Sequence, residues 1–314
     1  MPSIGYFLSC EEFGPRDLVR QARMAADAGF ERLWISDHYH PWNSEQGQSP
    51  FVWSVIGAIS EAVDLPVTTA VTCPTVRIHP AVIAQAAATA SVQLDGRFVL
   101  GVGSGEALNE HIFGDPWPPA AVRLEMLEEA VEVIRELHRG GVVNHRGKHY
   151  TVEGAQVFTL PERPVPIYVS GFGPKAVKLA ARIGDGYVAV MPSGDLVRMF
   201  REEGGGDKPA QGGFKVSYAP TEDEGLDTAH RIWPNTQLPG ELGQVLAQPS
   251  HFEQASQLVT RDMMAGTLPC GPDVEAYQRT LQAYTDAGFD EVYVAQMGPR
   301  QEEFFDFWRT RVRP

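Results

Sequence analysis

The sequence predicts an α/β fold in which a parallel sheet is covered by helices. Short apolar runs rich in β-branched residues recur along the chain, and amphipathic helical patterns lie between them. A chain of 314 residues is also long enough for a (β/α)8 barrel, which holds one hydrophobic core at this size. We therefore expect residues 1–314 to form a single (β/α)8 barrel domain.

Eight runs are candidate strands of this barrel. They are residues 4–8, 32–35, 67–72, 98–102, 166–170, 186–190, 214–218 and 291–296. The helical patterns include residues 17–28, 51–62, 80–94, 121–139, 174–183 and 274–287. Several of these helices begin beside a proline, which suits the first helical turn. Strands and helices thus alternate along the chain, as a parallel sheet requires.

Three tracts depart from the alternation. Residues 142–157 predict an inserted β-hairpin that turns at residues 146–148. Residues 204–213 hold five glycines and one proline, so we expect a mobile glycine-rich connection there. Residues 220–269 are rich in proline, glutamine and glycine. We expect them to form irregular turns and short helices that cover one end of the barrel.

Composition excludes several classes of protein. The chain is 43% apolar and 21% charged, and no apolar stretch approaches the roughly 20 residues of a membrane helix. A net charge of −14 argues against binding to nucleic acid. Residues 1–13 lack a basic segment ahead of an apolar run, so we expect no secretory signal and a cytoplasmic protein. Three cysteines without CxxC spacing, Cys10, Cys73 and Cys270, indicate neither a disulfide framework nor a zinc ribbon.

The segments that follow the strands carry the candidate chemistry, because barrel active sites lie where strands end. Residues 101–110 (GVGSGEALNE) combine glycines, which let the backbone approach a flat or phosphorylated ligand, with a carboxylate at Glu106. Residues 36–42 (SDHYHPW) hold two imidazoles, which suit proton transfer to or from an alcohol or carbonyl. Residues 170–175 form a glycine turn into a helix, whose first amides favour an anion.

Together with residues 9–15 (SCEEFGP), these segments resemble the luciferase-like (β/α)8 TIM-barrel flavin and deazaflavin enzymes. Within them, they are most similar to the group around the coenzyme-F420-dependent glucose-6-phosphate dehydrogenases. The resemblance spans most of the chain. It implies an F420-dependent oxidoreductase that transfers a hydride between the deazaflavin and a small organic substrate such as an alcohol or ketone. It also implies a homodimer.

The resemblance assigns four catalytic residues, namely His38, Glu106, Trp42 and Glu11. His38 is the expected base for the proton of an alcohol, and Glu106 is expected to deliver or withdraw a proton at the deazaflavin ring. His40 is outside this set and is expected to be a rim residue. The sequence does not set the direction of hydride transfer.

The resemblance also implies residues that bind the cofactor. They are Asp37, Ala70, Val71, Cys73, Gly103, Ser104, Gly105, Asn109, Ser170, Gly171, Phe172 and Gly173. Residues 67–75 match a segment that carries a non-proline cis peptide bond beneath the central ring, here expected between Ala70 and Val71. The turn at residues 170–173 is expected to hold the phosphate, with Lys175 as a charge partner.

The substrate pocket departs from the pattern of the glucose-6-phosphate enzymes. Ser193 and Gln254 stand where lysines are expected, and only Arg261 remains nearby. Two of three charge-assisted contacts, each about 1.5 to 3 kcal/mol, would be missing, so we expect glucose 6-phosphate to be a poor substrate. If a substrate anion is bound, Arg261 or Lys215 is expected to contact it. Two interpretations stay open for five apolar side chains, Met191, Pro192, Trp233, Met263 and Met264. If they cover the barrel mouth, the pocket favours a less polar alcohol, ketone or unsaturated compound. Otherwise they simply pack the covering segments against the barrel.

Three alternative functions stay open. The first is an FMN-dependent monooxygenase on the same barrel, although the GEALNE and DHxxPW patterns favour deazaflavin. The second is a metal-dependent hydrolase that uses His38 and His40, but no third ligand shows suitable spacing to this pair, so we expect no metal. The third is a non-catalytic binding protein. The dimer contacts expected from the resemblance involve residues 51–56, which are equally suited to a core.

Overall fold

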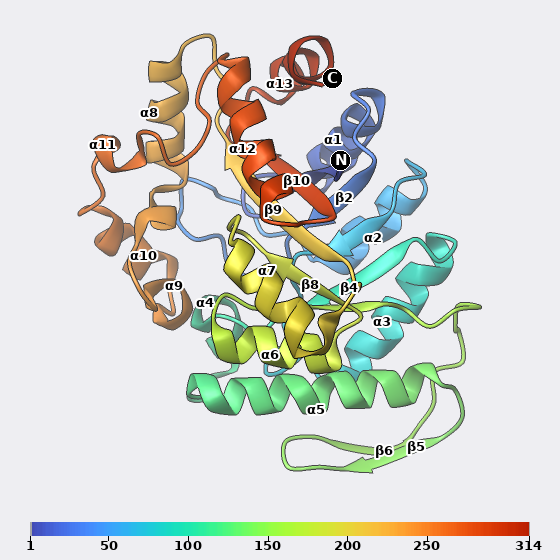
Figure 1. Cartoon of the computed structure of the whole chain (residues 1–314). Helices are drawn as coiled ribbons and strands as arrows, with labels where there is room; N and C mark the ends of the chain where they lie inside the picture. Colours follow the sequence, from blue (N-terminus) through green and yellow to red (C-terminus); the bar gives the residue numbers. More distant parts are fainter. Residues whose placement is uncertain (1, 314) are drawn as a thin grey trace.

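The computed structural model describes residues 2–313, in which eight parallel strands close into a barrel (Figure 1). The strands are β1 (Ser3–Leu8), β2 (Arg32–Ile35), β3 (Val67–Thr69), β4 (Phe98–Val102), β7 (Ile167–Ser170), β8 (Gly186–Ala189), β9 (Ala210–Val216) and β10 (Glu291–Gln296). Their order around the barrel is β1-β10-β9-β8-β7-β4-β3-β2. The expected (β/α)8 barrel is therefore confirmed.

Aromatic side chains fill the barrel interior. Trp34 stacks on Tyr293 with ring centroids 4.3 Å apart, and its indole Nε1 donates to Gln211 Oε1 at 2.9 Å. Two strand glycines make room for these rings, since a Cβ on Gly5 would lie 2.3 Å from Tyr293 and one on Gly213 would lie 2.4 Å from Trp34. The interior is a packed core, so ligands are confined to the end of the barrel.

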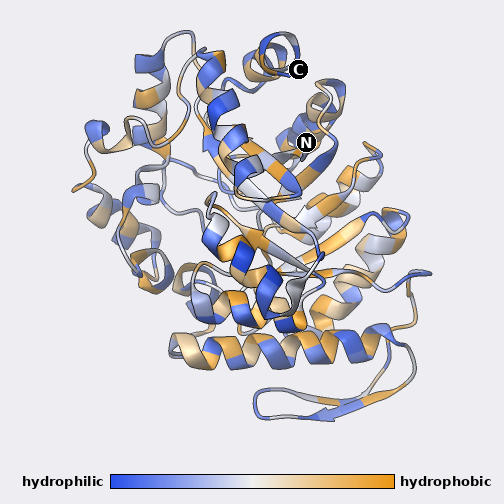
Figure 2. Cartoon of the chain, viewed as in Figure 1, coloured by the Kyte–Doolittle hydropathy of each residue, from blue (hydrophilic) through white to orange (hydrophobic). Residues whose placement is uncertain are grey.

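An outer ring of helices covers the barrel. It comprises α1 (Pro15–Asp27), α2 (Val52–Ser60), α3 (Pro80–Gln93), α5 (Ala120–His138), α6 (Pro174–Ile183), α7 (Gly194–Phe200), α12 (Val274–Asp286) and α13 (Gln301–Phe307). Figure 2 shows α5 striped with apolar and polar residues, and its buried face includes Leu127 and Ile134. Such one-sided burial attaches each helix to the sheet. Pro15, Pro80 and Pro174 occupy first turns, where their missing N–H is not needed.

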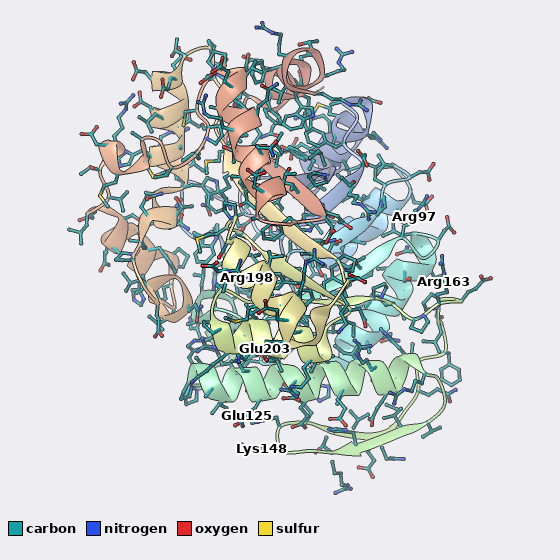
Figure 3. All side chains as sticks on the ribbon, in the orientation of Figure 1. Arg97, Glu125, Lys148, Arg163, Arg198 and Glu203 are labelled. Carbon is teal, nitrogen blue, oxygen red and sulfur yellow. The ribbon has the colours of Figure 1, made fainter. Side chains whose placement is uncertain are left out.

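The inserted hairpin lies outside α5 (Figure 1), and Tyr150, just before its second strand, donates to the Thr75 carbonyl in the loop after β3 at 2.9 Å. Its strands β5 (Val143–Arg146) and β6 (Thr151–Ala155) are antiparallel. Glu129 on α5 accepts hydrogen bonds from the backbone amides of residues 148–150. Lys148 and Glu125 form an ion pair of 2.6 Å across the same gap, where both are labelled in Figure 3. These contacts attach the hairpin to α5.

The glycine-rich tract at residues 204–213 differs from the expected mobile connection. A π-helical turn, Arg201–Gly205, continues α7, and β9 begins at Ala210, four residues before the expected start at Phe214. A Cβ on Gly212 would lie 2.6 Å from the ring of Tyr284. The last glycines of the tract are therefore strand residues against which large rings pack, and composition alone conceals that role.

The covering segment, residues 220–269, forms a cap beside the barrel (Figure 1). Its helices are α8 (Glu222–Ile232), α9 (Leu242–Val245), α10 (Pro249–Ser256) and α11 (Arg261–Met264), with a 3-10 turn at Pro234–Gln237. At 11 residues α8 is longer than the short helices expected here. Leu226, Trp233, Met264 and Met297 belong to a small apolar core beneath the cap. Within residues 2–313, no helix has the length and apolar character needed to cross a bilayer.

Candidate active site

The loops after β1, β2 and β4 bring Glu11, His38 and Glu106 together, and we call these three residues the reactive cluster. His38 Nε2 lies 3.4 Å from Glu11 Oε1 and 3.9 Å from Glu106 Oε2. The Glu11 side chain is 4% exposed, whereas that of Glu106 is 33% exposed. One imidazole nitrogen thus faces two carboxyl groups, one buried and one open to solvent.

Glu11 is the ionised carboxylate of the cluster. Its Oε2 accepts hydrogen bonds from the hydroxyls of Ser9 at 2.9 Å and Ser36 at 2.6 Å. Burial alone would raise the pKa of Glu11, but His38, Lys215 and the Ser36 hydroxyl outweigh burial and lower it.

The pKa of Glu106 is shifted in the opposite direction, upward. Burial raises the pKa of Glu106, and the neighbouring charge of Glu11 raises it further, against the lowering effects of His38 and Asn109. Glu106 therefore holds a proton at a higher pH than an ordinary carboxyl group. Two carboxyl groups whose pKa values move apart are suited to separate acid and base roles.

Asn109, on the short helix α4 (Ala107–Glu110), orients the imidazole. Its Oδ1 accepts from the backbone amides of Tyr39 at 2.9 Å and His40 at 3.2 Å, so its Nδ2 must be the donor. That Nδ2 lies 3.1 Å from His38 Nδ1 and 3.2 Å from Glu106 Oε2. The carbonyl of His40 is also 3.1 Å from His38 Nδ1. An unprotonated Nδ1 accepts from Asn109, and a protonated one donates to this carbonyl, so both states have a partner.

Trp42 joins this site to the covering segment. Its ring centroid lies 5.2 Å from that of His38. The indole also packs edge-on against the ring of Phe252 on α10, with the two centroids 5.0 Å apart. The structure therefore gathers all four residues expected to be catalytic, because each follows a strand whose end lies at the same rim of the barrel.

Lys215 on β9 also reaches the site. Its Nζ lies 4.1 Å from the ring centroid of Trp233 and 5.5 Å from that of Phe7. Burial lowers the pKa of Lys215, against the attraction of Glu11 and two other carboxylates. The sequence signal for this residue is weak, because it is one lysine near the end of an apolar strand. Only the closed barrel shows that this lysine lies near the residues that follow β1.

Glu12, next to Glu11, connects three parts of the barrel mouth. Its Oε1 accepts from Trp233 Nε1 at 2.5 Å, and its Oε2 accepts from the backbone amide of Gly298 at 2.7 Å. Burial raises the pKa of Glu12 to about 7, although both hydrogen bonds act in the opposite direction. Glu12 therefore fixes the indole beneath Lys215.

Asp37, which is expected to bind the cofactor, has its side chain held by other polar groups of the chain. It belongs to a second group, Asp37, Arg77 and Glu110, which we call the buried cluster. Arg77 Nη2 lies 2.7 Å from Asp37 Oδ1, and the Arg77 amide donates to Glu110 Oε2 at 2.6 Å. Thr72 donates to the other Asp37 oxygen at 2.8 Å. With a side chain only 1% exposed, Asp37 positions the loops.

Cys73 is likewise directed inward. Its Sγ lies 2.9 Å from Thr75 Oγ1, and a Cβ on Gly105 would lie 2.5 Å from that sulfur. Gly105 has a φ of +78°, which favours glycine. Cys73 thus packs beneath the glycine turn, and its contact with the cofactor stays a prediction.

The remaining residues expected at the cofactor line the barrel mouth. The cis peptide bond between Ala70 and Val71 is present, and a Cβ on Gly103 would lie 2.8 Å from Val71. At the start of α6, Gly173 caps the helix without a side chain, and no atom lies within 4 Å of the position its Cβ would take. Ser104, Ser170 and Phe172 keep exposed surface, while Gly171 is buried. A flat, glycine-lined surface and an open helix N-terminus fit a ring system that carries a phosphate.

Of the two cations considered for a substrate anion, Lys215 reaches the site and Arg261 does not. The Ser193 hydroxyl caps α7 by accepting from the Leu196 amide, and Gln254 is exposed on α10. Arg261 is bound to Asp223 at 2.5 Å and Asp227 at 2.6 Å. Because both carboxylates lie on α8, Arg261 stabilises the covering segment.

The methionines of the covering region differ in burial. Met264 is fully buried in the small core under the cap, and Trp233 is 3% exposed. Met191 and Met263 are 54% and 46% exposed. Packing of the cap therefore accounts for Met264.

The two histidines of residues 38–40 do not form a joint metal site. The His40 Nδ1 lies 2.9 Å from the Leu108 carbonyl, whereas His38 faces the reactive cluster. Between residues 2 and 313, no three His, Cys, Asp or Glu side chains are grouped so that they could hold a metal ion. The hydrolase alternative thus has no geometric support.

Comparison with known proteins identifies the family. The model of the luciferase-like monooxygenase family matches residues 3–291, so the chain belongs to this family. It is 34% identical to an F420-dependent glucose-6-phosphate dehydrogenase of Amycolatopsis mediterranei, over 100% of this chain and 98% of that protein. Its identity to the enzyme of the same name from Rhodococcus erythropolis is 32%, over 99% and 96%.

Solved structures are similar over the same length. An F420-dependent secondary alcohol dehydrogenase, in complex with an F420–acetone adduct, superimposes with a TM-score of 0.92 at 30% identity, covering 100% of this chain and 99% of that one. The coenzyme F420-dependent tetrahydromethanopterin reductase of Methanopyrus kandleri has a TM-score of 0.78 at 20% identity, covering 99% and 98%, and shares the fold.

Proposed function

We propose that this protein is an F420-dependent oxidoreductase that transfers a hydride between the coenzyme and a small secondary alcohol or its ketone. The observation that carries the proposal is His38, held between a charged Glu11 and a Glu106 of raised pKa at the barrel mouth. The F420-dependent relatives, at 30% identity or more over the whole chain, support the coenzyme.

The residues that would hold the coenzyme are those whose surroundings leave space for it. Ala70, Val71 and Gly103 would contact the ring, and the amides at the start of α6, after Gly173, would bind the phosphate. When bound, F420 supplies a ring carbon that accepts or donates a hydride.

The chain's own groups handle the protons. In the oxidation of an alcohol, His38 Nε2 takes the hydroxyl proton as the carbon loses its hydride, and the adjacent Glu11 carboxylate stabilises the resulting imidazolium. In the reduction of a ketone, His38 returns that proton to the oxygen. Glu106, whose raised pKa keeps its carboxyl group protonated to a higher pH, would give a proton to the ring that accepts the hydride and would take it back in the reverse direction.

The substrate distinguishes this chain from its dehydrogenase relatives. With Ser193 and Gln254 in place of the expected lysines and Arg261 bound to α8, the site lacks the three cationic contacts expected for a sugar phosphate, and Lys215 is the cation that remains near it. Reduction of F420 by propan-2-ol, butan-2-ol and glucose 6-phosphate, followed by absorbance, tests this. We expect kcat/KM for glucose 6-phosphate to be at least about 10-fold below that for the best alcohol, the scale of one lost charged contact. Efficient turnover of glucose 6-phosphate would contradict the proposal.

A cofactor titration tests the FMN alternative. We expect oxidised F420 to quench the protein's tryptophan fluorescence at micromolar concentrations, while FMN does not compete. Preference for FMN, with oxygen-dependent turnover, would replace the proposal by the monooxygenase alternative.

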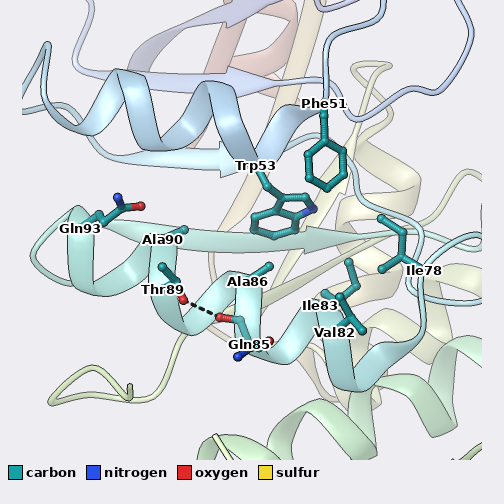
Figure 4. Close-up of a pocket in the computed structure, with 10 residues that line it drawn as sticks. All are labelled: Phe51, Trp53, Ile78, Val82, Ile83, Gln85, Ala86, Thr89, Ala90 and Gln93. Carbon is teal, nitrogen blue, oxygen red and sulfur yellow. Dashed lines mark hydrogen bonds between the residues drawn. The ribbon is translucent and has the colours of Figure 1, made fainter. Parts of the chain in front are cut away.

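The protein is also proposed to be a homodimer that pairs through α2 and α3. A groove of about 290 Å³ between these helices is lined by Phe51, Trp53 and Val82, among others (Figure 4). Phe51 is 56% exposed and Val82 is 55% exposed. Trp53 Nε1 is buried without an acceptor in residues 2–313. A second copy fits this face best, because under two-fold symmetry each Phe51 would enter the groove of the other subunit.

Sedimentation velocity at micromolar concentration tests the dimer. We expect a dimer for the native protein and a shift to monomer for Phe51→Ser. Leu258→Ser serves as the control, because Leu258 is 81% exposed on another face. A monomeric native protein would refute the pairing.

A further inference from the structure

We propose that Lys215 binds a second oxygen of the substrate, so that the preferred substrates are neutral vicinal diols and α-hydroxyketones. This inference rests on the proposed function, whose substrate class it narrows. It starts from an ammonium group that the fold places at the reactive cluster and leaves without an acceptor.

The ammonium of Lys215 has unused donors. Among residues 2–313, no acceptor makes a hydrogen bond to its Nζ and no carboxylate oxygen lies within 4.0 Å, although Trp233 and Phe7 hold it over their rings. Cation–π contact fixes the position of the charge but uses none of its three N–H groups. A half-buried ammonium therefore gains from an oxygen supplied by a ligand.

The barrel order places Lys215 across from His38. Around the barrel β9 is followed by β10, β1 and β2, so Glu11 after β1 lies between the lysine on β9 and the imidazole after β2. Glu11 contacts His38 at 3.4 Å but does not reach Lys215 within 4.0 Å. In this arrangement one substrate oxygen would bind His38 Nε2, and a second oxygen, on a neighbouring carbon, would bind Lys215.

The charge around Lys215 selects a neutral partner. Glu11, Glu12 and Glu106 all act electrostatically on this ammonium, and the ionised Glu11 would repel a substrate carboxylate or phosphate. Arg261, the other candidate cation, is already paired on α8. A hydroxyl or carbonyl oxygen accepts from Lys215 without adding a negative charge.

The experiment compares substrates with one and two oxygens. F420-loaded native enzyme, Lys215→Met and the control Lys178→Met are assayed with propan-2-ol, propane-1,2-diol and lactate. Lys178 is exposed and pairs with Glu203, so its removal leaves the site intact. For native enzyme and control we expect kcat/KM for the diol to exceed that for propan-2-ol by about 10-fold or more, which is typical of a charge-assisted hydrogen bond. Lys215→Met should remove most of this preference.

Other outcomes overturn the inference. If Lys215→Met lowers kcat/KM equally for the diol and for propan-2-ol, the lysine has only a general electrostatic role. If the native enzyme prefers lactate, Lys215 is an anion site. Either result leaves the proposed function standing.

If no alcohol reduces F420, the proposed function fails, and binding then tests Lys215 separately. Saturation-transfer NMR of propane-1,2-diol would support the inference if the signal of the native protein is lost in Lys215→Met. An undiminished signal would overturn it.

Discussion

The reactive cluster and the buried cluster use the same kind of chemistry, a basic group between two carboxyl groups, in very different settings. In the buried cluster Arg77 contacts Asp37 at 2.7 Å, and its side chain is 6% exposed. In the reactive cluster the imidazole stands 3.4 and 3.9 Å from its carboxyl partners, one of which is open to solvent. Enclosed contacts, at 2.7 Å from Arg77 to Asp37 and 3.5 Å from Arg77 to Glu110, hold loops in place, whereas contacts beside solvent leave room for a substrate oxygen.

The two clusters are also adjacent in sequence. Asp37 precedes His38, and Glu110 follows Asn109, so neighbouring residues of one loop divide between structure and chemistry. The buried cluster thereby fixes the loops that carry the reactive one. Substitutions in the buried cluster should therefore lower stability, whereas substitutions in the reactive cluster should lower turnover.

The largest expected effect is the loss of the buried cation. Arg77→Met leaves Asp37 and Glu110 without their partner, and we expect the free energy of unfolding to fall by about 3 to 5 kcal/mol. Urea unfolding measures this. Arg198→Met, which breaks an exposed ion pair with Asp195, is the control and should cost less than about 1 kcal/mol. Equal effects of the two substitutions would show that the buried cluster does not hold the loops.

Removal of the reactive groups should act on turnover instead. We expect His38→Ala and Glu106→Gln each to lower kcat by about 100-fold or more, because each removes a proton-transfer group. The affinity for F420, measured by fluorescence titration, should change much less. Turnover at the native rate in both variants would refute the assigned proton transfers.

Asn109→Asp should change the pH dependence of alcohol oxidation. The new carboxylate would accept from a protonated His38 Nδ1 and favour the imidazolium, which cannot act as a base. We therefore expect the pH at which kcat/KM reaches half its plateau to rise by about one unit, equivalent to about 1.4 kcal/mol. An unchanged profile would mean that Asn109 does not control the protonation of the imidazole.

The last expected effect concerns Glu12 and the pH dependence of stability. Its pKa of about 7 in the folded protein exceeds the ordinary 4.5, so the folded state holds this proton more tightly than the unfolded state. The resulting stability is fully present below about pH 4.5 and is lost as the pH rises through 7. Denaturation at pH 5, 6, 7 and 8 should show a weaker decline for Glu12→Gln than for the native protein. The exposed control Glu302→Gln should follow the native curve, and a Glu12→Gln curve with the native slope would contradict the assignment.

The sequence determined the barrel and the location of the site. Alternating apolar and amphipathic runs dictate a parallel sheet, and in such a barrel every strand ends at the same rim. Motifs that follow different strands therefore meet, and among them the resemblance to the luciferase-like family named Glu11, His38 and Glu106 before their distances were known. The roles of these residues stay predictions until the variants above are measured.

Only the tertiary structure decided which polar residues face the site. Asp37 turns inward because Arg77, forty residues later, lies beneath its loop. Arg261 is unavailable because α8 presents two carboxylates to it, and Lys215 reaches the site because closure of the barrel brings β9 near β1. The glycines of β9 are strand residues because distant rings pack on them. The environment of each of these residues depends on a contact with a residue far away in the chain. The local sequence pattern carries no information about which distant side chain makes that contact.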